Sequence, residues 1–517
     1  MSDVYTVPGV HVTESKGLSL SLQSGETAVP VFVGLFNAVS PPHQDAPLQC
    51  VRVESWLDFS TRFGPSDRIT VEMAPVAEGK AVRGQQSPPR VHVTSYVGSY
   101  SVRLYFENGG GPCYILSVNE REDLGKTEVL AQIGPAIARC PEITLLCWCE
   151  FIDAKMDKSI YEQLSPLLGA DMAVGGERGM FLLTDAWVDK PEVTAPASWT
   201  FKVPEVTDAA QVATYFPALE TGYARDYAAR VDHGVRVTRF DKNSDVFNVL
   251  KNHDLLKNED DSISLDCLRQ LSRTAQSLTE KSDAELLRAL VTTIDTQVNN
   301  ALPDLQKTAE PVVLRASVAM AGVYARVDRE RGVWKAPANV GLAGVNALIA
   351  VGIDTNKKEK PVWMQPAQVD DDLNIKLVDA RVNAIRTRRG QGIMVWGART
   401  GVAPEQADWL YVPVRRLFNA VERDARAALR TAMFEPNGPA VWEQLRGALD
   451  NYLHALWRQG ALQGETPAQA YFVLCGLGTT MTQTDINSGR LTLKVGLAAV
   501  RPAEFIVLEL TQDVARA

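Results

Sequence analysis

Residues 143–152 read ITLLCWCEFI, and residues 179–188 read GMFLLTDAWV. Both are short runs in which nearly every side chain is apolar, and helix-forming sequence lies between them. A short run that is apolar on both of its sides is typical of a strand buried on both faces, as in a parallel sheet with crossover helices. The sequence between Leu124 and Val188 therefore predicts the start of an α/β domain.

Upstream of these runs, the pattern is one of shorter apolar stretches separated by connections rich in proline and glycine. Between Ala28 and Val118 these stretches are VPVFVGLF, CVRV, RVHVTSYV, SVRLYF and CYILSV. Closely spaced short strands with turn signals between them indicate a β-rich region. Residues 21–120 are therefore predicted to form a β-rich N-terminal domain, followed by the α/β domain over 121–375.

Downstream, the sequence from about Arg236 to Pro311 is charged and helix-forming. Apolar residues recur there at every fourth position and are expected to line one helix face until Pro303 ends the helix; they are Leu286, Leu290, Ile294 and Val298. This spacing predicts a helical insertion over residues 236–311, within the α/β domain.

The C-terminal part predicts two further helices and two strands. One helix is expected to carry an apolar stripe until EPNGP stops it, and its members are Val414, Leu417, Val421, Ala425, Leu429 and Met433. The next helix is predicted to begin at Pro439 and to end at Gly460. The strands are predicted in LTLKVGLAAV from Leu491 and EFIVLEL from Glu504. Residues 376–500 are therefore predicted to be an α+β domain, and 501–517 a C-terminal strand or arm.

The N-terminal residues YTVPGVHV, from Tyr5 to Val12, alternate apolar and other residues around a proline and a glycine. Period-two spacing suits a strand, and a proline cannot donate a hydrogen bond within a central ladder. Residues 1–20 are therefore predicted to be an extended edge strand or free arm. Taken together, the chain is predicted to be an α/β and α+β multidomain protein with extended arms at both ends.

Bulk composition excludes several classes of partner. The 517 residues carry a formal net charge of -9, which repels a phosphate backbone, so direct nucleic-acid binding is not expected. The start MSDVYTVPGV lacks the basic and apolar regions of a secretory leader. The apolar runs are shorter than the roughly 18 residues that cross a bilayer, so no membrane anchor is expected.

No pattern of reactive residues predicts a catalytic, cofactor or metal site. The six histidines are scattered singly, Cys147 and Cys149 are too close in sequence for a zinc pair, and GxSxG is absent. Residues 370–372 are acidic but lack the spacing of a calcium loop. Gly478 to Met481 resembles the nucleophile segment of subtilisin-type proteases, and His233 resembles part of their histidine motif. The serine is missing, so an ordinary turn and a surface histidine are predicted instead.

The segment PVVLRASVAMAGVYARVDRERGVWKAPANVGLAGV, residues 311–345, resembles the most recognisable stretch of contractile tail sheath proteins, the pattern AGxYAxxDxxRGVWKAPAN. A second match runs from Leu373 to Glu435 and includes VWGART, VPVRRL and FEPN. Shorter matches follow the family's order: YTVPGVHV, FVG, DFSTRFG, FENGGGPCYILSV, PEITLL and PAEFIVLEL. The resemblance touches most of the chain and departs from the shortest members at 236–311 and around 61–100, which look like outward-facing additions.

This resemblance implies a central domain that is subtilisin-like in fold and not catalytic. It also implies a structural subunit, without cofactors, that forms hexameric rings stacked helically around an inner tail tube protein. Baseplate and tail terminator proteins are the further partners that it implies. Contraction of such a sheath drives the tube through a cell envelope, and the expected location is the sheath of a virion tail or of a phage-tail-like particle.

Two sets of residues follow as candidates for the sites of this function. Both chain ends are predicted to exchange strands with neighbouring subunits through Tyr5, Val7, Val10 and Val12 and through Ile506, Val507, Leu508 and Leu510. The helix from Val414 is predicted to face the tube with Arg415, Arg416, Arg423 and Arg426.

Two alternative functions stay open at this point: an α/β hydrolase-like enzyme, and another tail component such as a tube or baseplate protein. The sequence also leaves three kinds of particle open, which are a bacteriophage tail, a tailocin and an extracellular injection system.

Overall fold

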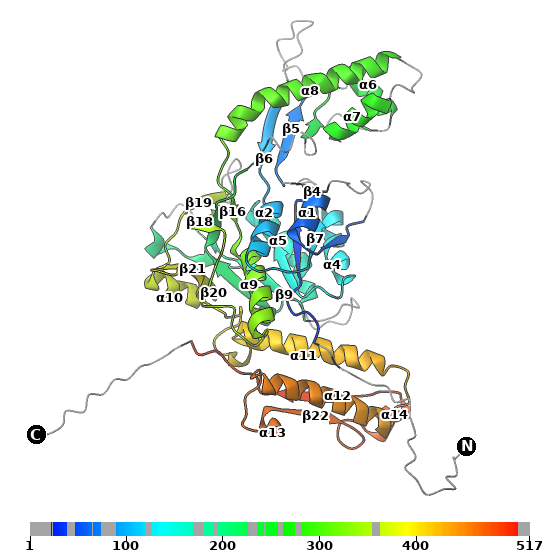
Figure 1. Cartoon of the computed structure of the whole chain (residues 1–517), viewed down its shortest axis with the longest axis vertical. Coiled ribbons are helices and arrows are strands. Elements are labelled where there is room, and N and C mark those ends of the chain that lie inside the picture. The colour runs from blue at the N-terminus through cyan, green and yellow to red at the C-terminus, as the bar shows by residue number, and fades with distance from the viewer. Residues whose placement is uncertain are drawn as a thin grey trace, which may run out of the picture. The chain divides into compact units, whose positions relative to one another are not determined.

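The computed structural model describes residues 22, 24–38, 47–64, 66–73, 89–118, 126–168, 179–189, 195–225, 227, 235–241, 244–253, 255–256, 262–274, 281–353 and 362–504. The chain divides into two compact units. The larger unit is Glu26–Arg416, and the smaller unit combines Met1–Gly25 with Leu417–Ala517. Figure 1 traces the elements of both units in chain order.

The larger unit contains a nine-stranded sheet in the order β17-β21-β20-β12-β9-β8-β1-β7-β3. In chain order these strands are β1 (Pro30–Gly34), β3 (Cys50–Val53), β7 (Cys113–Ser117), β8 (Leu145–Trp148), β9 (Phe181–Asp185), β12 (Val212–Phe216), β17 (Val340–Gly341), β20 (Val382–Arg388) and β21 (Gly392–Val395). The run from β7 to β20 is parallel, and the strands beyond it at both edges are antiparallel to their neighbours. Parallel neighbours need crossover connections, which helices supply.

Helices cover both faces of this sheet. One apolar core contains side chains of α2 (Gly98–Glu107) and α9 (Ala316–Arg331), and the other contains side chains of α4 (Thr127–Ala138) and α5 (Ala154–Leu164). Along β8 the side chains alternate between the two cores, as the two-residue period of a strand requires. The prediction of strands buried on both faces in residues 143–152 and 179–188 is therefore confirmed.

Helix α9 is buried along most of its length, which explains the small residues in its sequence. A Cβ atom at Gly322 would lie 2.4 Å from the carbonyl oxygen of Tyr105 in α2. Only glycine therefore allows the two helices to approach so closely. This contact accounts for the AG pair in the most recognisable sequence motif.

The described residues between 21 and 120 do not form a separate β-rich domain, which corrects the prediction for this range. Strands β1, β3 and β7 belong to the nine-stranded sheet, which continues into the predicted α/β region. The short helices α1 (Trp56–Arg62) and α2 also lie in this part of the chain, together with a small pair of strands, β2 (Asn37–Ala38) and β4 (Phe63–Gly64). Short apolar runs alone did not distinguish edge strands from inner strands of one large sheet.

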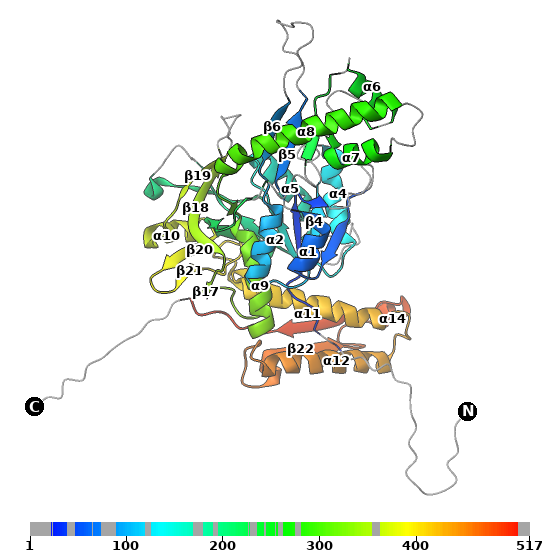
Figure 2. The same cartoon turned by 45° about the horizontal axis from the view of Figure 1, so that its top comes forward.

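A second sheet of the larger unit combines two distant parts of the sequence. It has the order β15-β14-β5-β6, formed by β5 (Arg68–Glu72), β6 (Arg90–Thr94), β14 (Val235–Thr238) and β15 (Ile263–Ser264). Helices α6 (Asp245–Asn252), α7 (Leu265–Thr274) and α8 (Lys281–Lys307) share a separate apolar core with it. We call this the insertion module; both views show α8 running beside β5 and β6 (Figures 1 and 2).

The predicted helical insertion is thus part of a mixed module. Helix α8 continues through Pro303 to Lys307, so the expected stop at Pro303 is wrong. Strand β14 pairs in parallel with β5, with Val235 opposite Ile69 and Val237 opposite Val71. The paired residues are 166 positions apart in the sequence. Neither part could bury its sheet face without the other.

A six-stranded sheet completes the larger unit. Its order is β11-β10-β18-β13-β16, with β19 paired to β18. The strands are β10 (Trp187–Val188), β11 (Phe201–Lys202), β13 (Ala218–Thr221), β16 (Val313–Leu314), β18 (Val345–Ile353) and β19 (Val362–Pro366), and α10 (Asp371–Asp379) packs on β20. Short 3-10 helices occur at Ser165–Leu167, Pro196–Ser198, Ala209–Gln211 and Ala407–Trp409.

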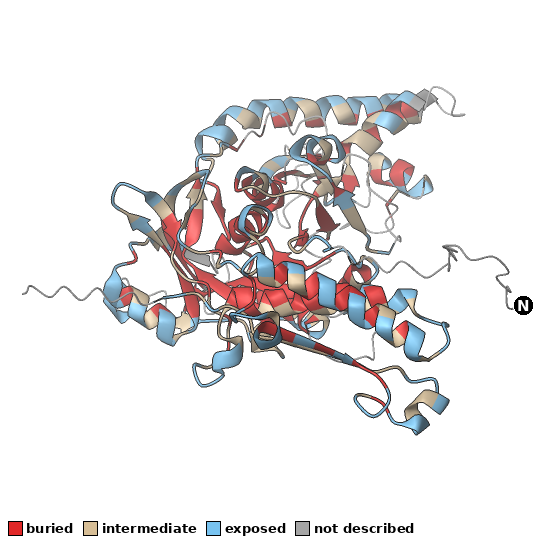
Figure 3. Cartoon of the chain, turned by 60° about the horizontal axis from the view of Figure 1, so that its bottom comes forward, coloured by how far each residue is buried: buried red, intermediate tan, exposed pale blue. Residues whose placement is uncertain are grey.

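The smaller unit is built from long helices and a β-hairpin. Helix α11 (Val412–Thr431) begins before the boundary at Leu417, and α12 (Pro439–Arg458), α13 (Pro467–Ala470) and α14 (Gln483–Asn487) follow. Strands β22 (Tyr471–Cys475) and β23 (Leu493–Leu497) pair antiparallel, and α12 packs on β22. The burial colours in Figure 3 show long helices with one buried and one exposed side.

The predicted helix ends in the smaller unit are correct for α12 and wrong for α11. Pro439 is the first residue of α12, and Gly460 has a φ of 77° just beyond its end. Helix α11 ends at Thr431, and Met433 is 60% exposed, so Met433 does not belong to the apolar stripe.

Candidate functional site

The residues predicted to exchange strands lie outside the described residues. They are Tyr5, Val7, Val10 and Val12 at one end and Ile506, Val507, Leu508 and Leu510 at the other. Strand exchange therefore stays a prediction. The described residues do include the chain next to both predicted arms and a two-stranded hairpin in the smaller unit.

Gly25, which follows the predicted N-terminal arm, is held within the smaller unit by a buried carboxylate of α11. The amide of Gly25 donates to Oδ1 of Asp424 at 3.4 Å, and the hydroxyl of Tyr452 in α12 donates to Oδ2 of Asp424 at 2.8 Å. A Cβ at Gly25 would lie 3.4 Å from Nη2 of Arg423. Burial, together with the charge of Asp424, raises the pKa of Tyr452, so its hydroxyl keeps the proton that it donates.

Two residues further on, the chain is held again within the larger unit. The hydroxyl of Thr27 donates to Oδ2 of Asp328 at 2.5 Å. The guanidinium of Arg416 donates to both oxygens of Asp328, at 2.9 and 2.6 Å, and to the carbonyl of Thr27 at 3.0 Å. It also lies 4.6 Å from the centre of the Tyr324 ring. The planar fork of arginine suits this two-point contact.

The four arginines predicted to face the tube have different surroundings. Arg416 is only 3% exposed and its guanidinium is occupied by Asp328, so this residue departs from the prediction: it supports its own subunit. Arg415 lies over the Trp409 ring at 4.3 Å. Arg426 pairs with Glu422 one turn earlier, and Arg423 lies beside Gly25 and Asp424. A tube contact by Arg415, Arg423 and Arg426 stays a prediction.

The C-terminal hairpin has one covered face and one exposed apolar face. Along β22, Tyr471, Val473 and Cys475 are buried, whereas Phe472 and Leu474 are 52% and 38% exposed. Phe472 pairs with Gly496 across the hairpin, where a Cβ would lie 2.2 Å from its ring. Within the described part of the chain, neither β22 nor β23 has a further strand beside it. Both hairpin edges thus present unpaired backbone groups.

The C-terminal arm begins directly after this hairpin. The amide of Ala498 donates to the carbonyl of Ala470 at 2.8 Å, and the amide of Gln463 donates to the carbonyl of Ala498 at 2.7 Å. Val500 donates to Ala461 at 3.3 Å. These bonds hold the chain beside α12 up to Val500, so the arm is rooted next to the open hairpin.

The turn that resembles a protease segment has a structural role in the same unit. The amide of Gly478 donates to the carbonyl of Met481 at 2.9 Å, and the hydroxyl of Thr480 donates to the carbonyl of Thr492 at 2.7 Å. The prediction of an ordinary turn is therefore confirmed, and His233 lies outside the described residues. The described residues contain no group of three or more His, Cys, Asp or Glu side chains placed to hold a metal ion. Nor do they contain a helix both long and apolar enough to cross a bilayer.

Comparison with known proteins places these features in a family. Residues 405–512 match the model of the phage tail sheath C-terminal domain. The chain is 31% identical to a chain of the cryo-EM structure of the anti-feeding prophage (AFP) helical sheath in its contracted state, with a TM-score of 0.61 over 99% of this chain and 100% of that one. The chain belongs to the contractile tail sheath family.

Further solved sheath chains agree with this assignment. A chain in the six-fold symmetrised AFP baseplate structure is 31% identical, with a TM-score of 0.60 and coverage of 99% and 100%. The contracted sheath complex of PVC, an extracellular contractile injection system, is 29% identical, with a TM-score of 0.55 and 99% coverage of both chains. A comparison with curated proteins finds no match. The protein is thus a structural subunit of a contractile sheath.

In this sheath subunit a group of buried charges around Arg315 forms a cluster that sequence reasoning missed. Arg315, 0% exposed, donates to both carboxylate oxygens of Asp157 at 2.7 and 2.8 Å and to the carbonyl of Glu150. Asp185 lies 3.8 Å from Arg315 and accepts from the amide and hydroxyl of Ser317. The cluster ties the start of α9 to Glu150 after β8, to Asp157 in α5 and to Asp185 at the end of β9. A single arginine inside the apolar run PVVLRASVAMAG was the available signal.

Burial sets the acid–base behaviour of this cluster. It raises the pKa of Glu150 to about 7, and it also raises the pKa values of Asp157 and Asp185. Burial alone would lower the pKa of Arg315, but Asp157 and its neighbours raise it. Arg315 therefore stays charged and compensates part of the surrounding negative charge.

Proposed function

We propose that this subunit polymerises as hexameric rings stacked helically around an inner tail tube, and that contraction of the sheath drives the tube through a cell envelope. The observation that carries the proposal is the open two-stranded hairpin of the smaller unit, which lies beside the root of the C-terminal arm. The six-fold and contracted assemblies of the AFP relatives support the ring geometry. Baseplate and terminator proteins are the further partners of such an assembly.

We infer that the open hairpin accepts strands from neighbouring subunits. The segments Tyr5–Val12 and Ile506–Leu510 have the alternating apolar residues of strands, and the hairpin offers two edges. A donated strand with about five backbone hydrogen bonds at roughly 1 kcal/mol each stabilises one link by about 5 kcal/mol. Because the link repeats at every subunit of every ring, the small stabilisation of each one adds up to a continuous connected lattice.

The exposed face of the hairpin strengthens the case for strand addition. Phe472 and Leu474 stand on the same face of β22 and remain half exposed in the single chain. A two-stranded hairpin is marginal by itself, and further strands would extend its apolar surface. Apolar side chains of a donated strand, such as Leu508, would lie beside Phe472 or Leu474 and remove them from water.

We infer a structural role without catalysis. The family consists of structural sheath proteins, and the segment that resembles a protease nucleophile is a hydrogen-bonded turn. The similarity to AFP and PVC sheaths over nearly the whole chain favours a contractile injection system as the parent particle. The match of residues 405–512 to the sheath C-terminal domain disfavours a tube or baseplate role.

Truncation of either arm tests strand exchange. Purified chain lacking residues 1–20, and chain lacking residues 505–517, should keep the circular dichroism of the full chain but form no tubes by negative-stain microscopy. A matched control keeps full length and replaces the arm residues Ser15 and Ser19 by alanine, which leaves the alternating apolar residues intact and should allow tubes to form. Sheath-length tubes from both truncations would rule out the exchange.

A point variant tests the acceptor independently. Leu474→Asp places a charge on the exposed hairpin face without touching either arm, and it should reduce tube formation while leaving the monomer folded. Leu57→Asp is the matched control, because Leu57 is 73% exposed in α1 of the larger unit. Equal loss of tubes in both variants would show that any surface charge disrupts assembly, and the hairpin would lose its special role.

A further inference from the structure

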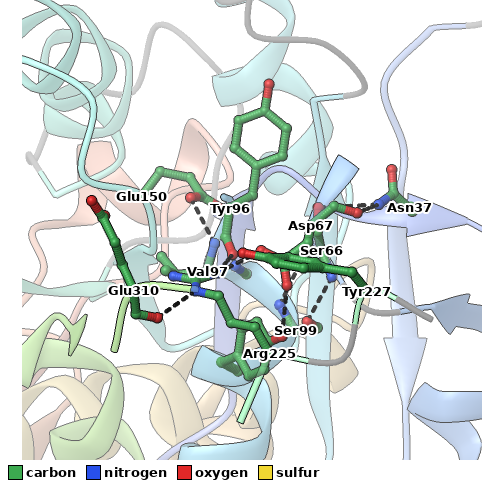
Figure 4. Close-up of polar contacts among 12 residues, drawn as sticks. Asn37, Ser66, Asp67, Tyr96, Val97, Ser99, Glu150, Arg225, Tyr227 and Glu310 are labelled. Carbon is green, nitrogen blue, oxygen red and sulfur yellow. Dashed lines mark hydrogen bonds and ion pairs between the residues drawn. The ribbon is translucent and has the colours of Figure 1, made fainter. Parts of the chain in front are cut away.

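The insertion module joins the rest of the larger unit through four crossings of the chain. The chain enters β5 after Ser66–Asp67, leaves β6 at 96–99, enters β14 after Arg225–Tyr227 and leaves α8 at 306–310. Figure 4 shows residues of all four crossings gathered around one side chain, Arg225. The apolar core of the module is separate from the two cores of the nine-stranded sheet. The polar junction is therefore where the two bodies are connected.

The Arg225 guanidinium reaches each of the other three crossings. Nη1 pairs with Oδ1 of Asp67 at 2.5 Å and donates to the carbonyl of Tyr96 at 3.3 Å, and Nε donates to the carbonyl of Glu310 at 3.1 Å. The side chains of Arg225 and Asp67 are 5% and 1% exposed. The second oxygen of Asp67 accepts from the Tyr100 hydroxyl at 2.6 Å, so both oxygens of this carboxylate have hydrogen-bond partners.

Side chains around Arg225 form hydrogen bonds that connect the four crossings in pairs. Ser66 and Ser99 bond reciprocally, amide to hydroxyl, at 2.8 and 2.5 Å. Gln306 of α8 accepts from the amide of Tyr227 at 3.2 Å and donates to the carbonyl of Arg225. The first and second crossings are thus paired, and so are the third and fourth.

Two further side chains bind this junction to the nine-stranded sheet. The Glu150 carboxylate, after β8, accepts from the amides of Val97 and Gly98 at 3.0 Å each. The amide group of Asn37 donates to the carbonyl of Ser66 at 3.1 Å. Hydrogen bonds of this kind depend on direction, unlike apolar contacts, so together they select one orientation of the connected parts.

We propose that Arg225 is the positioning residue that mounts the insertion module rigidly on the sheath body. With Arg225 in place, the insertion module keeps one orientation relative to the nine-stranded sheet, and it keeps that orientation when the sheath contracts. Removing Arg225 leaves the Asp67 carboxylate buried without its cation, and two backbone carbonyls lose a charged donor. Lysine cannot replace it, because one ammonium group cannot match the fork that contacts three crossings.

Hydrogen exchange measured by mass spectrometry on the full chain tests whether Arg225 holds the insertion module in place. In Arg225→Met, peptides covering 66–73 and 96–107 should exchange about a hundredfold faster at their junction amides. Peptides from β8 and from the middle of α8 should stay within about twofold of the wild type. Arg225→Lys should show most of the same effect, at least about tenfold.

Arg269→Met is the matched control. Arg269 also lies in an ion-pair network, with Asp266 and Asp295, but inside the module between α7 and α8. This variant should loosen α7 and leave the junction peptides unchanged. Unchanged junction peptides in Arg225→Met would overturn the proposal. Equal acceleration in the module, the body and the junction would overturn it as well, because Arg225 would then serve only global folding.

A second measurement keeps the proposal testable if Arg225→Met does not fold. Cryo-EM structures of the wild-type sheath before and after contraction, superposed on β8, β9 and β12, should place the module within about 1 Å in the two states. A rotation of the module about residues 66–67, 96–99, 225–227 and 306–310 between the states would overturn the proposal. Neither measurement depends on strand exchange between the arms.

Discussion

Replacing Arg416 by methionine removes the guanidinium that grips Asp328 and Thr27. The side chains of Arg416 and Asp328 are 3% and 6% exposed, so the perturbation acts on a buried pair. Methionine keeps much of the side-chain volume and leaves the contact with the Tyr324 ring apolar. The Asp328 carboxylate then keeps only the Thr27 hydroxyl as a neutral donor.

The expected loss of stability follows from these contacts. Breaking a buried ion pair by removing one partner costs about 3 to 5 kcal/mol, because a buried charge is left uncompensated. Thr27 remains bonded to Asp328, so the loss should fall near the lower end, about 3 kcal/mol. Asp328→Asn alone should cost a similar amount, and the double variant should cost clearly less than the sum of the two. That coupling is the signature of a direct pair.

Urea unfolding followed by circular dichroism measures these differences. Arg426→Met is the matched control on the same helix, since Arg426 is partly exposed and forms a surface ion pair with Glu422. It should change the free energy of unfolding by less than about 1 kcal/mol. The reasoning is refuted if Arg416→Met is as stable as the control and instead loses binding to purified tube. That result would restore the tube-facing role predicted for Arg416 from the sequence.

Three further outcomes are expected. Burial raises the pKa of Glu150 to about 7, so the folded chain holds a proton that the unfolded chain loses near pH 4.3. The free energy of unfolding should therefore fall by up to about 3 kcal/mol as the pH rises from 4.5 to 7.5. Urea titrations of Glu150→Gln should lack this part of the pH dependence. Gly496→Ala places a methyl group against the Phe472 ring and should destabilise the hairpin by about 1 to 3 kcal/mol, seen as faster amide exchange in β22. The double variant Arg415→Gln/Arg426→Gln should sediment less with purified tube at low salt, with the difference vanishing at high salt; unchanged sedimentation would contradict a tube-facing role.

The sequence predicted those elements whose own residues determine their structure. Strands β8 and β9 followed from continuous apolar runs, and α12 followed from Pro439, its apolar spacing and Gly460. Helix α11 was predicted too long because its period continues to Met433. The chain leaves the helix before that residue, and Phe434 adopts a φ of 69°. Periodicity describes a helix face but does not mark its last turn.

The sequence could not predict the contacts that join distant residues. Arg416 counted as surface because helix spacing placed it on the polar side of α11, whereas its partner Asp328 lies 88 residues earlier. Arg225 had no visible role, because its partner Asp67 is 158 residues away. Strands β5 and β14 likewise find each other only in the folded chain. The local sequence pattern contains no information on such distant pairs. These pairs connect parts of the fold that are far apart in the sequence.

If neighbouring subunits exchange strands as proposed, two anchors next to the predicted N-terminal arm would bear load in a contracting sheath. The chain is held at Gly25 by Asp424 in the smaller unit and at Thr27 by Asp328 and Arg416 in the larger unit. A pull on the arm therefore meets a buried polar contact before it reaches β1. The Thr27 anchor, at about 3 kcal/mol or more, is comparable to the roughly 5 kcal/mol of one donated strand. The link and its root lie in series along the chain, so each would carry the full tension. A root of comparable strength would hold under that tension, and the fold beyond β1 would keep its shape while the lattice shortens.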